Sequence, residues 1–272
     1  MTLDEDGVRV DVRPISSMLP HEDTIPAHVE RIASEIRHEG MQRDPIIVDS
    51  ESGTVLDGMH RLAAFAKLGL ENAVCCRVDY ASKVIELHRW ARAYSNGVGN
   101  ITGLLQDAGV SRKATFSEAF ASLDARECGL AVLGSSGAFL PERKVDLQGA
   151  FAMVRGLDAM AMGAGWKREF FPEEDIDSAL QDEKKVVVLI QRLGKDDVIA
   201  AARSGRLFPC KTSMHIIEPR PVAVNVPTSK LAVLTGTELR RQISQAGSRI
   251  LPRGSKYQGR TYKERLLVLS PE

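Results

Sequence analysis

The stretch that most constrains this chain is residues 54–65, TVLDGMHRLAAF. Apolar and β-branched residues lead to Asp57, a single glycine follows, and helix-forming residues begin at once. This pattern predicts a strand that turns on Gly58 into a helix. The first N–H groups of a helix have no partner within the helix and lie at the positive end of its dipole. The predicted turn therefore suits a phosphate group.

The side chains of this turn fit the same chemistry. Arg61 can donate paired hydrogen bonds to anionic oxygens, and His60 can donate to them as well. Asp57 offers a hard oxygen ligand, placed where Mg²⁺ could bridge phosphates. The spacing alone leaves a second interpretation open, namely an ordinary turn with Asp57 at the helix N-terminus and Arg61 in solvent.

Composition restricts the class of protein. A chain of 272 residues that is 43% hydrophobic and 26% charged is an ordinary globular chain, with either one elaborated domain or two lobes. Lysine plus arginine and aspartate plus glutamate balance at 36 each, so the chain as a whole has no basic footprint for nucleic acid. We expect a cytoplasmic protein with no membrane partner, because no leader-like or membrane-spanning apolar run is present. The four cysteines have no metal-ligand spacing and are expected to be free, buried thiols.

The rest of the pattern predicts a mixed α/β fold. Strands are expected at 8–13, 45–49, 54–57, 73–80, 83–94, 129–133, 186–190 and 222–227. Helices are expected at 26–39, 58–69, 101–108, 114–123, 146–162, 175–183 and 195–204. Three methionines of the helix at 146–162 are expected in the core: Met153, Met160 and Met162. The last residues, from about 237, are rich in arginine and lysine and predict either a nucleic-acid-binding tail or, more simply, a solvated basic surface.

The chain is expected to divide at the run Asn96-Gly97-Val98-Gly99-Asn100. We predict a nucleotide-binding domain at 1–95 and an inserted or diverged lobe at 96–184. Residues 185–272 are expected to return to complete the active-site cleft and to end in the basic tail.

Two motifs far apart in the chain resemble the free L-serine kinases, which have the ParB/sulfiredoxin-like fold. Pro20-His21-Glu22 and residues 56–61, LDGMHR, resemble the family's Pro-His-Glu loop and Asp-Gly-His-His-Arg motif. Residues 207–215, LFPCKTSMH, resemble its Phe-Pro-Pro-Lys-Thr/Ser-Thr-Arg-His segment, and Arg220-Pro221 and Asn225-Val226-Pro227 resemble the segment that ends Asn-Val-Pro-Leu. The resemblance covers about residues 8–94 and 185–231.

This resemblance implies a kinase that transfers a phosphoryl group from ADP or ATP, with Mg²⁺, to the hydroxyl of free serine or a related hydroxy compound. By analogy Glu22 is the base, Asp57 holds Mg²⁺ or orients the phosphates, and His60 acts beside them in catalysis. The phosphates are expected on the turn formed by Asp57, Gly58, Met59, His60 and Arg61. The amino acid is expected to bind at Trp90, Lys211, Thr212, Ser213 and His215.

Two departures from the family pattern leave the acceptor open. Met59 replaces the first His of the Asp-Gly-His-His-Arg motif, and Met214 replaces the Arg expected before His215. Sulfiredoxin chemistry is disfavoured because it needs a thiol where Met59 stands. A ParB-like transcriptional regulator or DNA-associated protein, and a metabolite sensor without turnover, remain as alternatives. For two of the site residues a structural interpretation also stays open, with Glu22 as a surface-loop carboxylate and Trp90 as a core aromatic.

Overall fold

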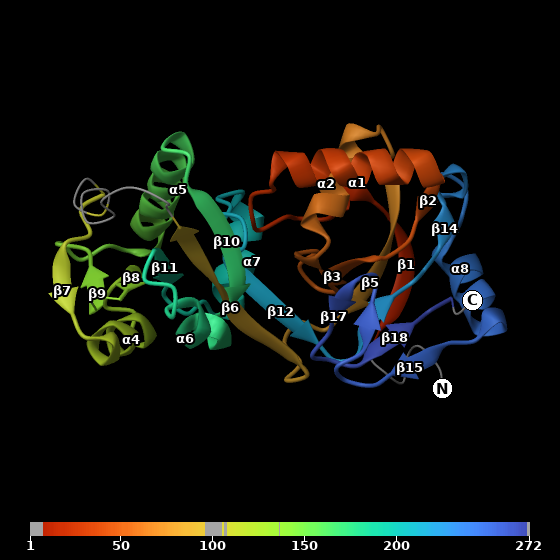
Figure 1. The fold of residues 1–272 in the computed structure, drawn as a ribbon. Helices are drawn as coiled ribbons and strands as arrows, with labels where there is room; N and C mark the ends of the chain where they lie inside the picture. The colour runs from red at the N-terminus through yellow and green to blue at the C-terminus, as the bar shows by residue number, and fades with distance from the viewer. Residues whose placement is uncertain (1–7, 96–104, 106–107, 136, 271–272) are drawn as a thin grey trace. The chain divides into compact units, whose positions relative to one another are not determined.

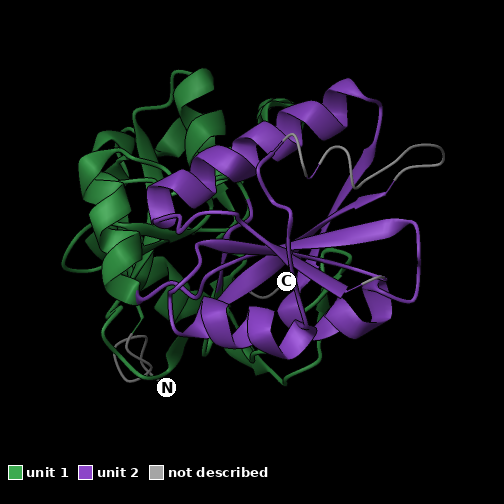
Figure 2. Ribbon diagram, turned by 90° about the vertical axis from the view of Figure 1, so that its left-hand side faces the viewer, with its two compact units in different colours: residues 1–86, 195–210, 215–272 green, residues 87–194, 211–214 purple. Residues whose placement is uncertain are grey.

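The computed structural model describes residues 8–95, 105, 108–135 and 137–270. These residues form two compact units, which Figure 2 colours separately. The first unit consists of residues 1–86, 195–210 and 215–272, and the second of residues 87–194 and 211–214. The first boundary falls at Glu86 rather than at the predicted Ser95, because most of the long strand β6 (Ile85–Ser95) belongs to the sheet of the second unit.

The first unit begins with a four-stranded sheet in the order β1-β5-β3-β4. Its strands are β1 (Arg9–Pro14), β3 (Ile46–Asp49), β4 (Val55–Asp57) and β5 (Asn72–Val78). β3 pairs antiparallel with β4, which confirms the predicted hairpin, and parallel with β5. Two helices, α1 (Pro26–Glu39) and α2 (Met59–Lys67), pack against each other (Figure 1). Pro26 starts α1 and left-handed Gly40 ends it, as predicted.

The C-terminal residues fold onto this unit and are not a tail. Helix α8 (Gly236–Ala246) packs against β1, and its Arg240 donates to the carbonyl of Val10 at 2.8 Å. A three-stranded sheet has the order β13-β18-β15, with β13 and β18 parallel. The remaining elements of the first unit are β2 (Met41–Gln42), α7 (Lys195–Ser204), β13 (Arg220–Val222), β14 (Val226–Pro227), β15 (Arg249–Leu251), β16 (Lys256–Tyr257), β17 (Arg260–Thr261) and β18 (Leu266–Val268).

The second unit is built on a seven-stranded sheet in the order β10-β6-β11-β8-β9-β7, with β12 (Ser213–Ile217) also paired to β6. Its other strands are β7 (Arg112–Ala114), β8 (Leu130–Gly134), β9 (Gly137–Leu140), β10 (Lys167–Pro172) and β11 (Lys185–Ile190). Its helices are α4 (Phe116–Asp124), α5 (Leu147–Gly163) and the short α6 (Ile176–Ala179). The core combines small and branched residues of the sheet with Ala119 and Leu123 of α4. Thr115 and Glu118 start α4 with a capping box.

Several sequence predictions need correction. Residues 114–123 are not all helical, because Arg112–Ala114 is the strand β7. The helix predicted at 175–183 ends at Ala179. The single strand predicted at 222–227 is interrupted, because Ala223 and Asn225 adopt positive φ values. The proposed boundary run at 96–100 lies outside the described residues, as does most of the helix predicted at 101–108.

The methionines predicted in the core of α5 are not its buried residues. Met162 is 54% exposed, and Met153 and Met160 are only partly buried. The buried face of α5 consists instead of two alanines, two branched aliphatic residues and one aromatic residue: Ala150, Ala161, Val154, Leu157 and Phe151. All four cysteines are free and buried, as predicted. Among the described residues no helix is both long and apolar enough to cross a membrane.

Candidate active site

The centre of the candidate site is the turn from β4 into α2, in the first unit. Asp57 ends the strand, and Gly58 is the N-cap of the helix with φ of +100°. No side chain caps this end, and the first turn of α2 carries no acidic residue. The partial positive charge at the start of α2 is therefore not offset by its own residues, as an anion-binding turn requires.

Arg61 lies folded back over this turn. Its Nη2 donates to Asp57 Oδ2 at 3.0 Å and to the carbonyl of Pro45 at 2.8 Å. The guanidinium packs against Gly58, where a Cβ atom would lie 3.0 Å from Nη2. Its Nε is buried without a hydrogen-bond partner among the described residues. Arg61 also lines a cavity of about 260 Å³ with Ile32 of α1 and Phe65 of α2, so its side chain borders open space.

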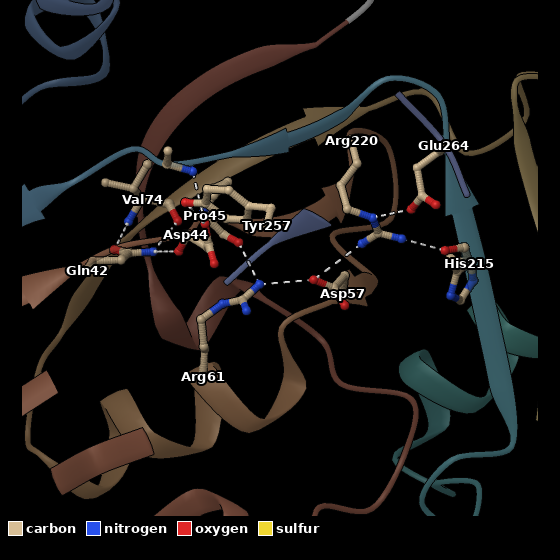
Figure 3. Close-up of polar contacts among 11 residues, drawn as sticks. Gln42, Asp44, Pro45, Asp57, Arg61, Val74, His215, Arg220, Tyr257 and Glu264 are labelled. Carbon is tan, nitrogen blue, oxygen red and sulfur yellow. Dashed lines mark hydrogen bonds and ion pairs between the residues drawn. The ribbon is translucent and has the colours of Figure 1, made fainter. Parts of the chain in front are cut away.

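A second guanidinium, that of Arg220, was not predicted as a site residue and approaches the same carboxylate. Arg220 Nη1 lies 3.5 Å from Asp57 Oδ2 (Figure 3). Its Nη2 donates to the carbonyl of His215 at 2.6 Å, and its Nε pairs with buried Glu264. Arg220-Pro221 is itself one of the segments that carry the resemblance, which is the signal that could have found it. Met214, which stands where the family has an arginine, is buried.

These cations set the charge state of Asp57. Burial by itself would raise the pKa of Asp57, but the nearby guanidiniums of Arg220, Arg61 and Arg260 outweigh it and hold this pKa well below its ordinary value. Burial would lower the pKa of Arg220, yet Asp57 and Glu264 raise it above its ordinary value. Asp57 is therefore ionised, and the three nearby guanidiniums carry more positive charge than its carboxylate neutralises.

Glu22 is held in a buried loop and is not a surface carboxylate. It is 4% exposed and forms an isolated bridge with Phe208. On either side of it, Phe208 N–H donates to the His21 carbonyl and Asp23 N–H donates to the Phe208 carbonyl, each at 2.8 Å. The first and second motifs are thus bonded to each other through their backbones.

The same loop is also fastened to the two elements that carry the turn. Leu19 pairs with residues 53–55 beside β4, and His21 Nδ1 donates to the Val55 carbonyl at 2.7 Å. At its other end, Ile25 N–H donates to His60 Nε2 at 3.0 Å. Because Ile25 is the N-cap of α1, His60 joins the start of α2 to the start of α1. The ring that was predicted to bind phosphate thus positions the Glu22 loop.

Two buried histidines lie at this loop, one within it and one on β12. The rings of His21 and His215 meet edge to face, with centroids 5.5 Å apart, and His215 Nε2 hydrogen-bonds the Tyr80 hydroxyl at 2.8 Å. His21 Nε2 lies 3.8 Å from Glu22 Oε1. Burial lowers the pKa of both histidines, and the nearby guanidinium of Arg220 lowers that of His215 further. His215 therefore joins the first-unit site as a neutral, buried group.

The other predicted substrate residues belong to the second unit. Trp90 N–H donates to the Thr212 carbonyl at 3.2 Å, and Lys211 Nζ lies 4.8 Å from the centre of the Trp90 ring. Thr212 and Ser213 are buried, and Trp90 is only partly buried. These four residues form one cluster of their own. Met59, on the turn that starts α2, is partly exposed in the first unit.

Comparison with known proteins reveals relatives over most of the chain, although no family model matches it. An ATP-dependent L-serine kinase of Staphylothermus marinus is 26% identical over 238 residues, which are 80% of this chain and 89% of that protein. An ADP-dependent L-serine kinase of Thermococcus kodakarensis is 21% identical over 80% of this chain and 90% of that protein. A ParB-like protein of Sulfolobus acidocaldarius is 38% identical over 73 residues, which are 27% of this chain and 36% of that protein.

Solved structures with a similar fold include free serine kinases. A variant of free serine kinase solved in complex with ADP matches with a TM-score of 0.71 at 21% identity, covering 82% of this chain and 95% of that one. The mixed α/β fold predicted from the sequence is therefore confirmed. In sequence and in fold, this chain is a relative of the free L-serine kinases, as its two motifs predicted.

Proposed function

We propose that this protein is a kinase that transfers a phosphoryl group from ATP or ADP to the hydroxyl of free L-serine. The observation that carries the proposal is the joining of the two motifs in the first unit. There Glu22 is bonded to Phe208 of the second motif and fastened to the strand that ends at Asp57. Relatives named L-serine kinases along 80% of the chain give the acceptor.

Glu22 acts as the general base in this proposal. Phosphoryl transfer needs positioned groups and neutralised charge more than covalent catalysis. The Glu22 loop is fastened at Leu19, His21, Phe208 and Ile25, so the carboxylate is held in place before substrate arrives. Glu22 accepts the proton of the serine hydroxyl as its oxygen attacks the terminal phosphorus, and the bond from that phosphorus to the bridging oxygen of the donor breaks.

The donor phosphates bind at the start of α2. The N-terminus of α2, which has no acidic residue in its first turn, and the guanidinium of Arg61 supply positive charge there. Arg220 adds a second guanidinium through its contact with Asp57. His60 orients the Glu22 loop and borders the same turn. Trp90, Lys211, Thr212, Ser213 and His215 are proposed to bind the amino acid.

Mg²⁺ fits this site only as an ion that arrives with the nucleotide. No cluster of three or more potential metal ligands among His, Cys, Asp and Glu occurs in the described part of the chain. Asp57 can offer a single carboxylate, and its Oδ2 already contacts Arg61 and Arg220. When bound to the donor, Mg²⁺ would neutralise phosphate charge, with Asp57 as one oxygen ligand beside the phosphates and water.

The test is ³¹P NMR of the full chain with Mg²⁺, either ATP or ADP, and L-serine. We expect an O-phosphoserine signal that grows with time, together with ADP from ATP or AMP from ADP. Threonine, homoserine and glycerol serve as competing acceptors in parallel samples. Nucleotide binding without any phosphorylated acceptor would instead identify a sensor, and retention on DNA at physiological salt would favour a ParB-like regulator.

A further inference from the structure

The C-terminal hairpin formed by β16 and β17 lies next to the phosphate turn. Its Tyr257 hydroxyl donates to Asp44 Oδ1 at 3.4 Å, and the same oxygen accepts from Ala223 N–H at 2.9 Å (Figure 3). Asp44 directly precedes Pro45, whose carbonyl holds Arg61. The hairpin is thus anchored to the segment that positions Arg61.

The tip of the hairpin lines the cavity beside Arg61, and its far strand lies near Arg220. Gln258, at the tip, lines the cavity of about 260 Å³ that Arg61 also lines. Arg260, on β17, lies with its guanidinium carbon 4.7 Å from the centre of the Tyr262 ring. The same ring lies 5.9 Å from the guanidinium carbon of Arg220. Tyr262 therefore holds Arg260 beside the group that contacts Asp57.

Arg260 differs from the other two guanidiniums around Asp57 in its accessibility. Arg61 is committed to Asp57 and Pro45, and Arg220 is buried against Glu264. Arg260 is exposed, and within the described part of the chain it forms no ion pair. Over the described ranges, the site thus has three guanidinium groups but only two carboxylates, Asp57 and Glu264. Among these described groups, the guanidinium without a carboxylate partner is that of Arg260, which is exposed to solvent.

We propose that Arg260 is a further donor-binding residue, which binds the terminal phosphate of the nucleotide on the turn that starts α2. This inference rests on the proposed function, since it assigns the same turn to the donor. A guanidinium supports two parallel hydrogen bonds to phosphate oxygens, and stacking on Tyr262 fixes its plane beforehand. The basic C-terminal segment then serves the nucleotide site and not nucleic acid.

Calorimetric titration of the full chain with ADP and with AMP tests this assignment. We expect Arg260→Ala to weaken ADP binding about 10-fold, the scale of one hydrogen-bonded contact to a charged group. AMP binding should fall less, because AMP lacks the terminal phosphate. Arg260→Lys should restore part of the ADP affinity. Thermal unfolding should not change, because the side chain is exposed.

Lys256→Ala is the matched control, since it removes one exposed positive charge from the same hairpin, opposite Thr261. We expect it to change ADP affinity less than twofold. Equal losses from Lys256→Ala and Arg260→Ala would overturn the inference, as would wild-type ADP binding by Arg260→Ala. If Arg61→Ala still weakens ADP binding in that second case, the proposed function stands without Arg260. If neither arginine matters, the turn is not the donor site and both proposals fail.

Discussion

At the scale of single residues, the role of each arginine in the site follows from its hydrogen-bond and ion-pair partners. Arg61 has one amino group bonded to Asp57 and Pro45 and a buried Nε, while its guanidinium borders an open cavity. Arg220 is buried between Asp57 and Glu264. We therefore assign ligand binding to Arg61 and electrostatic support of Asp57 to Arg220.

Arg61→Ala should weaken nucleotide binding by about 1.5–3 kcal/mol, the scale of a hydrogen bond to a charged group. Titration calorimetry with ADP measures the change. Arg31→Ala is the control, because Arg31 lines the same cavity but pairs with Glu35 on the exposed surface of α1. Unchanged ADP affinity in a folded Arg61→Ala protein would contradict the assignment of this turn.

At the scale of elements, the turn between β4 and α2 depends on Gly58. Its φ of +100° disfavours a side chain, and a Cβ atom there would displace the Arg61 guanidinium. Gly58→Ala should therefore cost about 1–3 kcal/mol of unfolding free energy and also weaken ADP binding. Gly69→Ala, just beyond the other end of α2, has φ of +70° with open space around it, so only stability should fall. Equal ADP affinity in the two variants would contradict the role of the Gly58 turn.

Local sequence signals correctly predicted the helices and strands whose ends are marked by proline, glycine or a short turn. Pro26 and Gly40 delimit α1, and the hairpin from β3 to β4 brings Asp57 to the start of α2, as predicted. Signals that depend on tertiary contacts were missed. The left-handed backbone at Ala223 and Asn225 breaks a strand that propensity alone would continue.

Charge patterns also did not show which C-terminal basic residues contact the rest of the unit, although most of these residues are exposed, as a solvated basic surface requires. The C-terminal arginines look like a solvated tail, yet Arg240 bonds β1 and Arg260 stacks on Tyr262 beside the site. Arg220 could be recognised as part of a motif, but its pairing with Asp57 joins residues 163 positions apart, which no local pattern encodes. The candidate site was thus predicted at its loops and turns, and missed where distant segments complete it.

At the scale of the whole molecule, two buried neutral histidines couple stability to pH. Burial lowers the pKa of His21 and His215 below the value of about 6.5 expected in the unfolded chain. As pH falls through 6.5, the unfolded chain takes up protons that the folded protein excludes, so the unfolding free energy decreases. The decrease should reach up to about 1.4 kcal/mol per histidine for each pH unit between 6.5 and 5.

Denaturant unfolding between pH 7.5 and 5 measures this dependence. His215→Gln should be less stable at pH 7.5 but should lose less stability on acidification than the wild type. His38→Gln, on the exposed side of α1, controls for loss of an imidazole. A wild-type unfolding free energy that is constant across this range would contradict the coupling. The low pKa of Asp57 does not interfere, because that carboxylate stays ionised throughout.

The most direct measurement of the central claim is the rate of O-phosphoserine formation by Glu22→Gln, with ADP affinity determined on the same preparation. The variant keeps the shape of the side chain and removes the base, so turnover should fall about 10²–10⁴-fold while ADP affinity stays near that of the wild type. Asp23→Asn, the neighbouring carboxylate, is the matched control and should keep most of the activity. Near wild-type phosphorylation of serine by Glu22→Gln would contradict the account, because the buried loop would then not carry the base.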